Sequence, residues 1–239
     1  MADLFAAAVQ VAEQEWKAWG KSSWNCITGK KSSGFHSDDE DRWSQYVIDT
    51  YLTHFYKKPI RWPTRILISE DDYPWSAVTI SHFFLSAGFK AKPLLSGRPT
   101  PAQFETWAAS SNKAEFPASQ GHSDYIRWSI AARRAKAKNA AYWGYRADEP
   151  DAIPEVGDLV GYPRAKGVKL TKAKALAYFD RTGSYTSHTD LVVAKRPGEI
   201  DVIGGNVRDS VTRKTLRIGP DGRLADTSHA WFVVMKLRP

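Results

Sequence analysis

The chain has 239 residues, which suits one large domain or two small ones. Hydrophobic residues make up 42% and aromatic residues 13% of it, enough for a sizeable core, and no apolar run approaches the roughly 18–20 residues that span a bilayer. The net charge of +8 favours an anionic partner such as nucleic acid, an anionic membrane or a cell-wall polymer.

The N-terminus and the cysteine count indicate the compartment in which the chain is made. An acid, Asp3, stands where a secretory signal would carry basic residues, and Glu13 interrupts the apolar stretch that follows. We therefore expect synthesis in the cytoplasm without a signal peptide. The single cysteine, Cys26, excludes an intramolecular disulfide, and we expect a half-buried thiol there and not a nucleophile.

The first part of the chain has helical patterns. Apolar residues recur at three- and four-residue steps over 3–19, which predicts a helix, and the polar residues 20–36 predict a loop. Ser37, followed by four acids, predicts the cap of a second helix over about 38–56. The same acids offer hard-metal ligands, but they match no calcium-loop spacing, so capping is favoured.

Three further helices are predicted at about 75–87, 101–113 and 121–139. Gly88 is placed to end the first of them. The third carries a run of arginines and lysines, which is more often a solvated face than a nucleic-acid site.

After residue 150, short β-type runs alternate with turns. The predicted strands are 158–162, 188–194, 200–203, 211–218 and 231–237. The stretch 167–187 predicts a loop with a short helix at the rim of a site. Helices followed by antiparallel strands indicate an α+β fold, and we expect residues 1–36 to form one compact unit with a domain over 37–239.

Ser76 is the candidate nucleophile. It stands where the chain turns into the helix predicted at 75–87, so its hydroxyl and any oxyanion beside it would gain from the positive end of the helix dipole. His188 on a predicted strand is the candidate base, and Asn206, after the next strand, would bond its far ring nitrogen. Asp190 is a competing orienter, because strand alternation puts it on the same face as His188. This combination is the papain-like arrangement for attacking an amide carbonyl.

Each of these residues also has a structural interpretation. A serine before an apolar helix is usually a cap or first-turn residue, and a lone histidine on a strand is usually structural. An asparagine after two glycines is usually a turn residue. Only the order of the three residues along the chain favours a catalytic site.

Four more side chains are candidates for substrate contact or for support of the site. Trp75 and Tyr73 would line the cleft, although aromatic residues are more often in the core. His122 and Asp124 belong to a His-Ser-Asp-Tyr block that opens the helix predicted at 121–139. For His122 the alternative is a core or capping role.

No cofactor and no metal are expected. The sequence lacks a His-Glu-x-x-His motif, paired cysteines and two histidines within five residues. It also lacks a glycine-rich phosphate loop.

Five blocks together resemble a bacterial family of uncharacterised proteins. The blocks are residues 74–77, 116–126, 157–160, 187–193 and 202–207. That family is similar to the CHAP and NlpC-type amidases, which cut peptide or amide bonds in peptidoglycan. The resemblance implies a papain-like fold from about residue 40 onward, with Ser76 in place of their cysteine, His188 at their histidine and Asn206 at their third polar residue. A serine hydroxyl is a far weaker acid than a thiol of pKa ~8.5, so Ser76 either works with a base or belongs to a site that kept only ligand binding.

Three functions follow as hypotheses. The first is a peptidoglycan amide or peptide-bond hydrolase: a cell-wall lytic enzyme or antibacterial toxin that reaches the periplasm or wall through phage lysis, as an endolysin does, or by injection. Secretion or lysis machinery and an immunity protein are its candidate partners. The second is a catalytically inactive module of the same fold that binds the cell wall. The third, nucleic-acid binding by the basic helix, is the least favoured.

Overall fold

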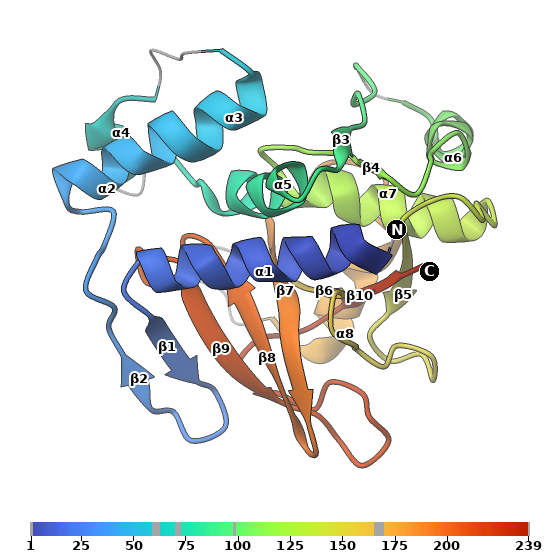
Figure 1. The fold of residues 1–239 in the computed structure, drawn as a ribbon. Helices are drawn as coiled ribbons and strands as arrows, with labels where there is room; N and C mark the ends of the chain where they lie inside the picture. The colour runs from blue at the N-terminus through green and yellow to red at the C-terminus, as the bar shows by residue number, and fades with distance from the viewer. Residues whose placement is uncertain (1, 59–62, 70–72, 98, 165–169, 239) are drawn as a thin grey trace.

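Strands from both halves of the chain join one sheet (Figure 1). In the computed structural model, residues 2–58, 63–69, 73–97, 99–164 and 170–238 are described. The strands of the main sheet are β1 (Ser22–Asn25), β2 (Lys31–Ser32), β5 (Tyr142–Arg146), β6 (Leu159–Pro163), β7 (Ser187–Arg196), β8 (Glu199–Gly204), β9 (Thr212–Arg217) and β10 (Val233–Leu237). They lie in the order β2-β1-β9-β8-β7-β6-β10-β5, and neighbouring strands are antiparallel except β1 and β9. The α+β architecture predicted from the sequence is confirmed.

Three helices lie against one face of this sheet. They are α1 (Ala2–Ala18), α5 (Ser76–Ser86) and α7 (His122–Arg134), with α6 (Pro101–Ala109) packed on α7. The remaining elements are α2 (Asp41–Tyr46), a π-helical segment (Val47–Leu52), α3 (Thr53–Tyr56), α4 (Arg65–Ser69), a two-stranded sheet of β3 (Lys90–Ala91) and β4 (Glu115–Phe116), α8 (Lys172–Leu176) and a 3-10 turn (Ala177–Asp180). No helix in the described part of the chain is both long and apolar enough to cross a membrane.

The prediction of a loop over 20–36 is wrong in part. Strand β1 lies in this segment and pairs in parallel with β9, which comes near the end of the chain. Short polar strands carry little periodicity, and this one forms because a distant strand offers it backbone hydrogen bonds. The N-terminal segment is thereby built into the main sheet.

The second predicted helix is present, but its cap is not Ser37. Helical structure begins at Asp41, and the N-cap position is Glu40, which makes no side-chain cap hydrogen bond. The Ser37 hydroxyl instead accepts from the backbone N–H of Asp39 at 3.1 Å, inside the preceding turn. The acid cluster therefore stabilises a turn before the helix.

Helix α5 ends as predicted at Gly88, which has a φ of +98°. The N–H of Gly88 donates to Leu85 O at 3.1 Å, and the N–H of Phe89 donates to Phe84 O at 3.1 Å. This pair of bonds is a Schellman motif, and the Phe84 and Phe89 rings pack edge to face as its usual apolar contact, with centroids 5.2 Å apart. The prediction of a helix over 121–139 is too long, since α7 ends at Arg134 and Lys136 has a φ of +52°.

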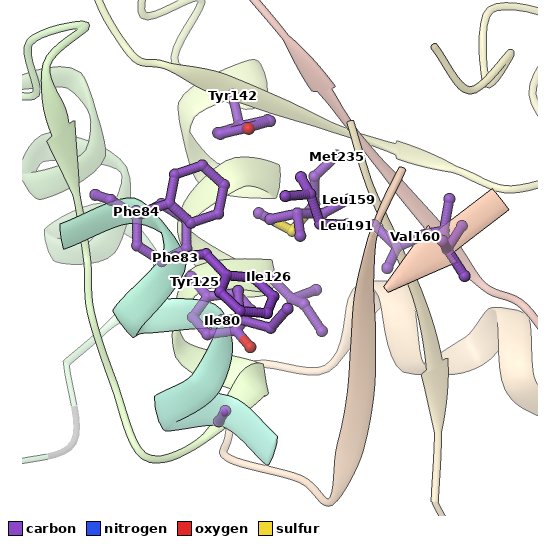
Figure 2. Packing of buried hydrophobic residues seen from close by; sticks show 14 of the residues in the cluster. Ile80, Phe83, Phe84, Tyr125, Ile126, Tyr142, Leu159, Val160, Leu191 and Met235 are labelled. Atoms are coloured by element: carbon purple, nitrogen blue, oxygen red, sulfur yellow. The ribbon is translucent and has the colours of Figure 1, made fainter. Parts of the chain in front are cut away.

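The core lies between these helices and the sheet (Figure 2). Phe83 and Phe84 of α5 and Ile126 of α7 face Leu159, Leu191 and Met235 of the strands, and Val160 lies on the other side of the strands, as alternation requires. Packing of the apolar face of α5 against β7 and β8 fixes where its first residue, Ser76, must lie.

The segment 167–187 holds a short helix, as predicted. It is α8, with Thr171 as its N-cap, accepting from the N–H of Lys174 at 3.3 Å. Residues 167–169 of the segment lie outside the described part of the chain.

Candidate functional site

Ser76 is the first residue of α5 and is 3% exposed. Its N-cap is Trp75, whose side chain makes no capping hydrogen bond, so no side chain competes for the amides of the first turn. The positive end of the helix dipole therefore acts on the Ser76 hydroxyl. This part of the predicted site is present.

The imidazole in contact with Ser76 is His122. Its Nε2 lies 2.7 Å from Ser76 Oγ, and His122 is the first residue of α7, 5% exposed. From the sequence, His122 was expected only to contact substrate or support the site, and His188 was expected to take the Ser76 proton. The hydrogen bond between Ser76 and His122 shows that the assignment to His188 is wrong. It forms because the N-termini of α5 and α7 meet at this point.

The second ring nitrogen of His122 is held by two hydroxyls. Nδ1 lies 2.9 Å from Thr189 Oγ1 and also contacts the Tyr125 hydroxyl, and these two hydroxyls are 3.0 Å apart. When Nδ1 donates its proton to Thr189, Nε2 has its lone pair free for the Ser76 hydroxyl. Thr189 faces α7 because it alternates with His188 and Asp190 along β7.

His188 is oriented by Asp190 and not by Asn206. Its Nε2 lies 3.1 Å from Asp190 Oδ1, while its buried Nδ1 has no hydrogen-bond partner among the described residues. The predicted bond from Asn206 is therefore wrong, and the competing orienter named from the sequence holds the ring. Asn206 has a φ of +50°, and its backbone carbonyl accepts from Arg164 at 3.4 Å.

A buried ion pair fixes Asp190 in turn. Lys214 Nζ lies 2.7 Å from Asp190 Oδ2, and both side chains have no exposed surface. Burial acts to raise the pKa of Asp190, but Lys214 and His188 hold it well below its usual range. Burial acts to lower the pKa of Lys214, and Asp190 more than offsets this, so that the pKa is raised. Asp190 is thus a carboxylate that accepts the Nε2 proton of His188.

The two imidazoles lie side by side and are neutral near pH 7. Their ring centroids are 5.0 Å apart, with the planes tilted by 48°. Burial lowers the pKa of His188 to about 4 and that of His122 well below its ordinary value, and the proximity of His188 lowers the latter further. Both rings can therefore accept a proton at neutral pH.

Two glycines allow the side chains of β7 and the helix α5 to approach the end of β8 closely. A Cβ on Gly204 would lie 2.2 Å from Asp190 Oδ1 and 3.0 Å from His188 Nε2, and a Cβ on Gly205 would lie 2.3 Å from Thr79 Oγ1 of α5. The end of β8 therefore has no side chains because the His188–Asp190 pair and the first turns of α5 occupy the space. The sequence suggested a turn at these glycines, and close packing is their physical role.

A pocket of about 850 Å³ adjoins the site. Its wall includes Pro74, two residues before Ser76, and Tyr162, whose ring centroid is 5.1 Å from that of His188. His229 and Trp231 also line it, and His229 lies against Tyr162 at 3.9 Å between centroids. The volume suits a short peptide segment.

The predicted cleft residues lie elsewhere. Trp75 has no exposed surface, stacks on Trp19 at 5.1 Å, and donates to Asp38 Oδ2 at 2.6 Å, so it belongs to the core. Tyr73 is also buried, and its hydroxyl donates to Gln120 Oε1 at 2.8 Å.

Asp124 supports the loop before α7. It accepts from the Ser119 hydroxyl at 2.5 Å, and in the first turn of the helix its charge complements the dipole. Its hydrogen bond goes to this loop and not to the His122 ring.

Four contacting residues were not identified from the sequence: Tyr125, Thr189, Tyr162 and Lys214. Lys214 left one signal, because it occupies the inward-facing position between Thr212 and Leu216 in a predicted strand. A lysine at a buried strand position requires a buried acid as partner. The other three resemble ordinary core residues.

Within the described residues, no group of three or more His, Cys, Asp or Glu side chains is arranged to hold a metal ion. The basic residues of α7 are engaged internally: Arg133 pairs with Glu149 at 2.6 Å, Arg134 with Asp180 at 2.9 Å, and Arg127 covers the Phe104 ring.

Fold and site together define an α+β protein in which a helix-terminal serine contacts a neutral, buried histidine beside a second His–Asp pair. The chain belongs to a family of uncharacterized proteins conserved in bacteria (DUF2272), which matches residues 99–237, more than half of its length. The matched segment contains His122, His188 and Asp190, and Ser76 precedes it. No curated protein and no solved structure matches the chain.

Proposed function

We propose that this protein hydrolyses amide or peptide bonds in peptidoglycan, with Ser76 as the nucleophile. The observation that carries the proposal is the 2.7 Å contact between Ser76 Oγ and His122 Nε2 at the start of α5. A hydroxyl bonded to a neutral imidazole at the positive end of a helix is a combination that supports acyl transfer.

The chemistry follows from the contacts. His122 takes the Ser76 proton as Oγ attacks the carbonyl carbon, and the first-turn amides of α5 stabilise the oxyanion. The imidazolium gives this proton to the leaving amine, and water then releases the acyl group by the same route. The charge of Asp190 acts to raise the pKa of His122, opposing burial and His188, and so favours its protonated form in the transition state.

The substrate class rests on three supports. The order of the blocks resembles the CHAP and NlpC-type amidases, the helix-terminal serine that contacts a buried imidazole suits an amide hydrolase, and the charge of +8 suits an anionic wall. We include in the proposal delivery by phage lysis or injection, with an immunity partner in the second case.

The test is incubation of purified protein with peptidoglycan sacculi and mass spectrometry of the released muropeptides. Wild type is expected to release cleaved peptides, and Ser76→Ala and His122→Ala to lower the rate by about 10³-fold or more. Ser86→Ala, at the other end of α5, and His36→Ala are matched controls that should keep full activity. Release that persists in both site variants would overturn the proposal.

The second candidate is a non-catalytic wall-binding module, favoured by the burial of Ser76 and of His188, which has no exposed surface. In that case sacculi would retain wild type and Ser76→Ala equally, and no new amine termini would appear. Ser76→Cys separates the two further, because a thiolate restores the nucleophile of the resembled enzymes.

A further inference from the structure

The 850 Å³ pocket lined by Pro74 and Tyr162 carries unbalanced positive charge. Arg164 and Lys172 line it, and the single carboxylate on its wall, among the described residues, is Asp226. Asp226 is 9% exposed and accepts from the Ser228 N–H at 3.0 Å, the Ser228 hydroxyl and Trp231 Nε1 at 3.1 Å. All three bonds reach Oδ1, and among the described residues Asp226 forms no ion pair with Arg164 or Lys172, so it leaves the two cations without a counterion.

Arg164 is held in place without an acid. Its backbone N–H donates to Thr186 O at 3.0 Å, and its guanidinium donates to Asn206 O at 3.4 Å. No carboxylate lies within ion-pair distance of it in the described part of the chain. A guanidinium has five N–H donors, so most of them remain for a ligand in the pocket.

The charge of Arg164 acts on the pKa values of three neighbouring histidines. Burial lowers the pKa of His122, of His188 and of His229, the last to about 3, and Arg164 lowers each of them further. An anion bound to Arg164 would offset this effect. Occupation of the pocket would then make His122 a stronger base.

We propose that the pocket binds a carboxylate-bearing peptide, with Arg164 as the anchor of the carboxylate and Tyr162 and Trp231 as the apolar walls. A planar guanidinium accepts a carboxylate by two parallel hydrogen bonds, which selects it over a neutral amide of the same shape. The inference rests on the proposed hydrolase in one respect, since it names the substrate class as an acidic peptide. Binding itself needs no catalysis.

The experiment measures binding to Ser76→Ala protein by isothermal titration calorimetry. The probe is the dipeptide N-acetyl-Ala-Glu, and its uncharged counterpart is N-acetyl-Ala-Gln-amide. The acidic peptide is expected to bind at least about 10-fold more tightly, and Arg164→Gln to remove this preference. Arg164→Lys should keep only part of it, because a lysine offers a point charge without the fork.

Arg217→Gln, an exposed arginine at the end of β9, is the matched control and should change nothing. Circular dichroism on each variant establishes that the fold is intact. Equal binding of the two peptides, a preference that survives Arg164→Gln, or tighter binding of inorganic phosphate than of the acidic peptide would each overturn the inference.

The two proposals fail separately. Selective binding of the acidic peptide without any cleavage of sacculi would leave the pocket assignment standing and remove the hydrolase. Cleavage of sacculi without selectivity for the acidic peptide would support the hydrolase and remove the pocket assignment.

Discussion

Lys214 Nζ and the carboxylate of Asp190 lie 2.7 Å apart with neither side chain exposed. Strands β7 and β9 that carry them are separated by β8, so the pair spans the sheet behind the site. Removing either charge would leave the other buried without an opposite charge, and the orientation of His188 depends on Asp190.

Lys214→Met is therefore expected to lower the free energy of unfolding by about 3–5 kcal/mol. Lys195→Met is the control, because its partner Glu155 is 57% exposed, and its effect should stay below about 1 kcal/mol. Urea denaturation of the three proteins measures both values. A Lys214→Met variant as stable as wild type would show that Lys214 carries no charge in the folded state.

Stability should fall in mild acid because of the buried imidazoles. The pKa of His188 is about 4 in the folded protein, against about 6.5 when unfolded, so the unfolded state binds more protons between these values. The contribution of His188 to the free energy of unfolding is then fully present above about pH 6.5. Below that pH it decreases by up to about 1.4 kcal/mol per pH unit. Denaturation curves at several pH values should have a shallower pH slope in His188→Gln, and parallel slopes would contradict the assignment.

Thr189→Val should impair catalysis and leave the fold intact. It removes one of the two hydroxyls that contact Nδ1 of His122 and leaves that of Tyr125, so the tautomer that keeps Nε2 free for Ser76 is less favoured. We expect a fall of about 10-fold or more in the rate of muropeptide release, in line with tautomer control of catalytic histidines. Thr106→Val on α6 is the control, and an unchanged rate in both variants would argue against His122 as the base.

Gly205→Ala tests the close approach of α5 to β8. The added Cβ would lie 2.3 Å from Thr79 Oγ1 and 2.5 Å from Thr79 Cβ, so the helix must shift. Such overpacking is expected to cost about 1–3 kcal/mol in thermal or urea unfolding and to lower activity through displacement of Ser76. Gly183→Ala, which meets nothing within 4 Å, should be neutral or slightly stabilising.

Cys26 should be an unreactive thiol, as expected from the sequence. Burial raises the pKa of Cys26 to about 11. At about pH 8, alkylation by iodoacetamide should therefore be about 100-fold slower in the folded protein than in urea. Cys26→Ala should keep the rate of muropeptide release, whereas loss of that rate would make the thiol part of the chemistry.

Local patterns predicted the helix that starts at Ser76 and the strands that carry His188 and Asp190. These succeed because helix periodicity, a terminal glycine such as Gly88 and β-branched runs are properties of neighbouring residues. The pattern failed for β1, which exists only through pairing with β9.

The sequence alone determined the serine at the helix start and Asp190 on the same face as His188, since both follow from the periodicity of a single element. Only the tertiary structure decided that His122 contacts Ser76, that Lys214 neutralises Asp190 and that Gly204 and Gly205 leave the space for them. These contacts join residues between 14 and 126 positions apart on different elements, and two of them depend on backbones packing too closely for a Cβ. Their geometry is set by how α5 and α7 pack on the sheet, and no local pattern records it.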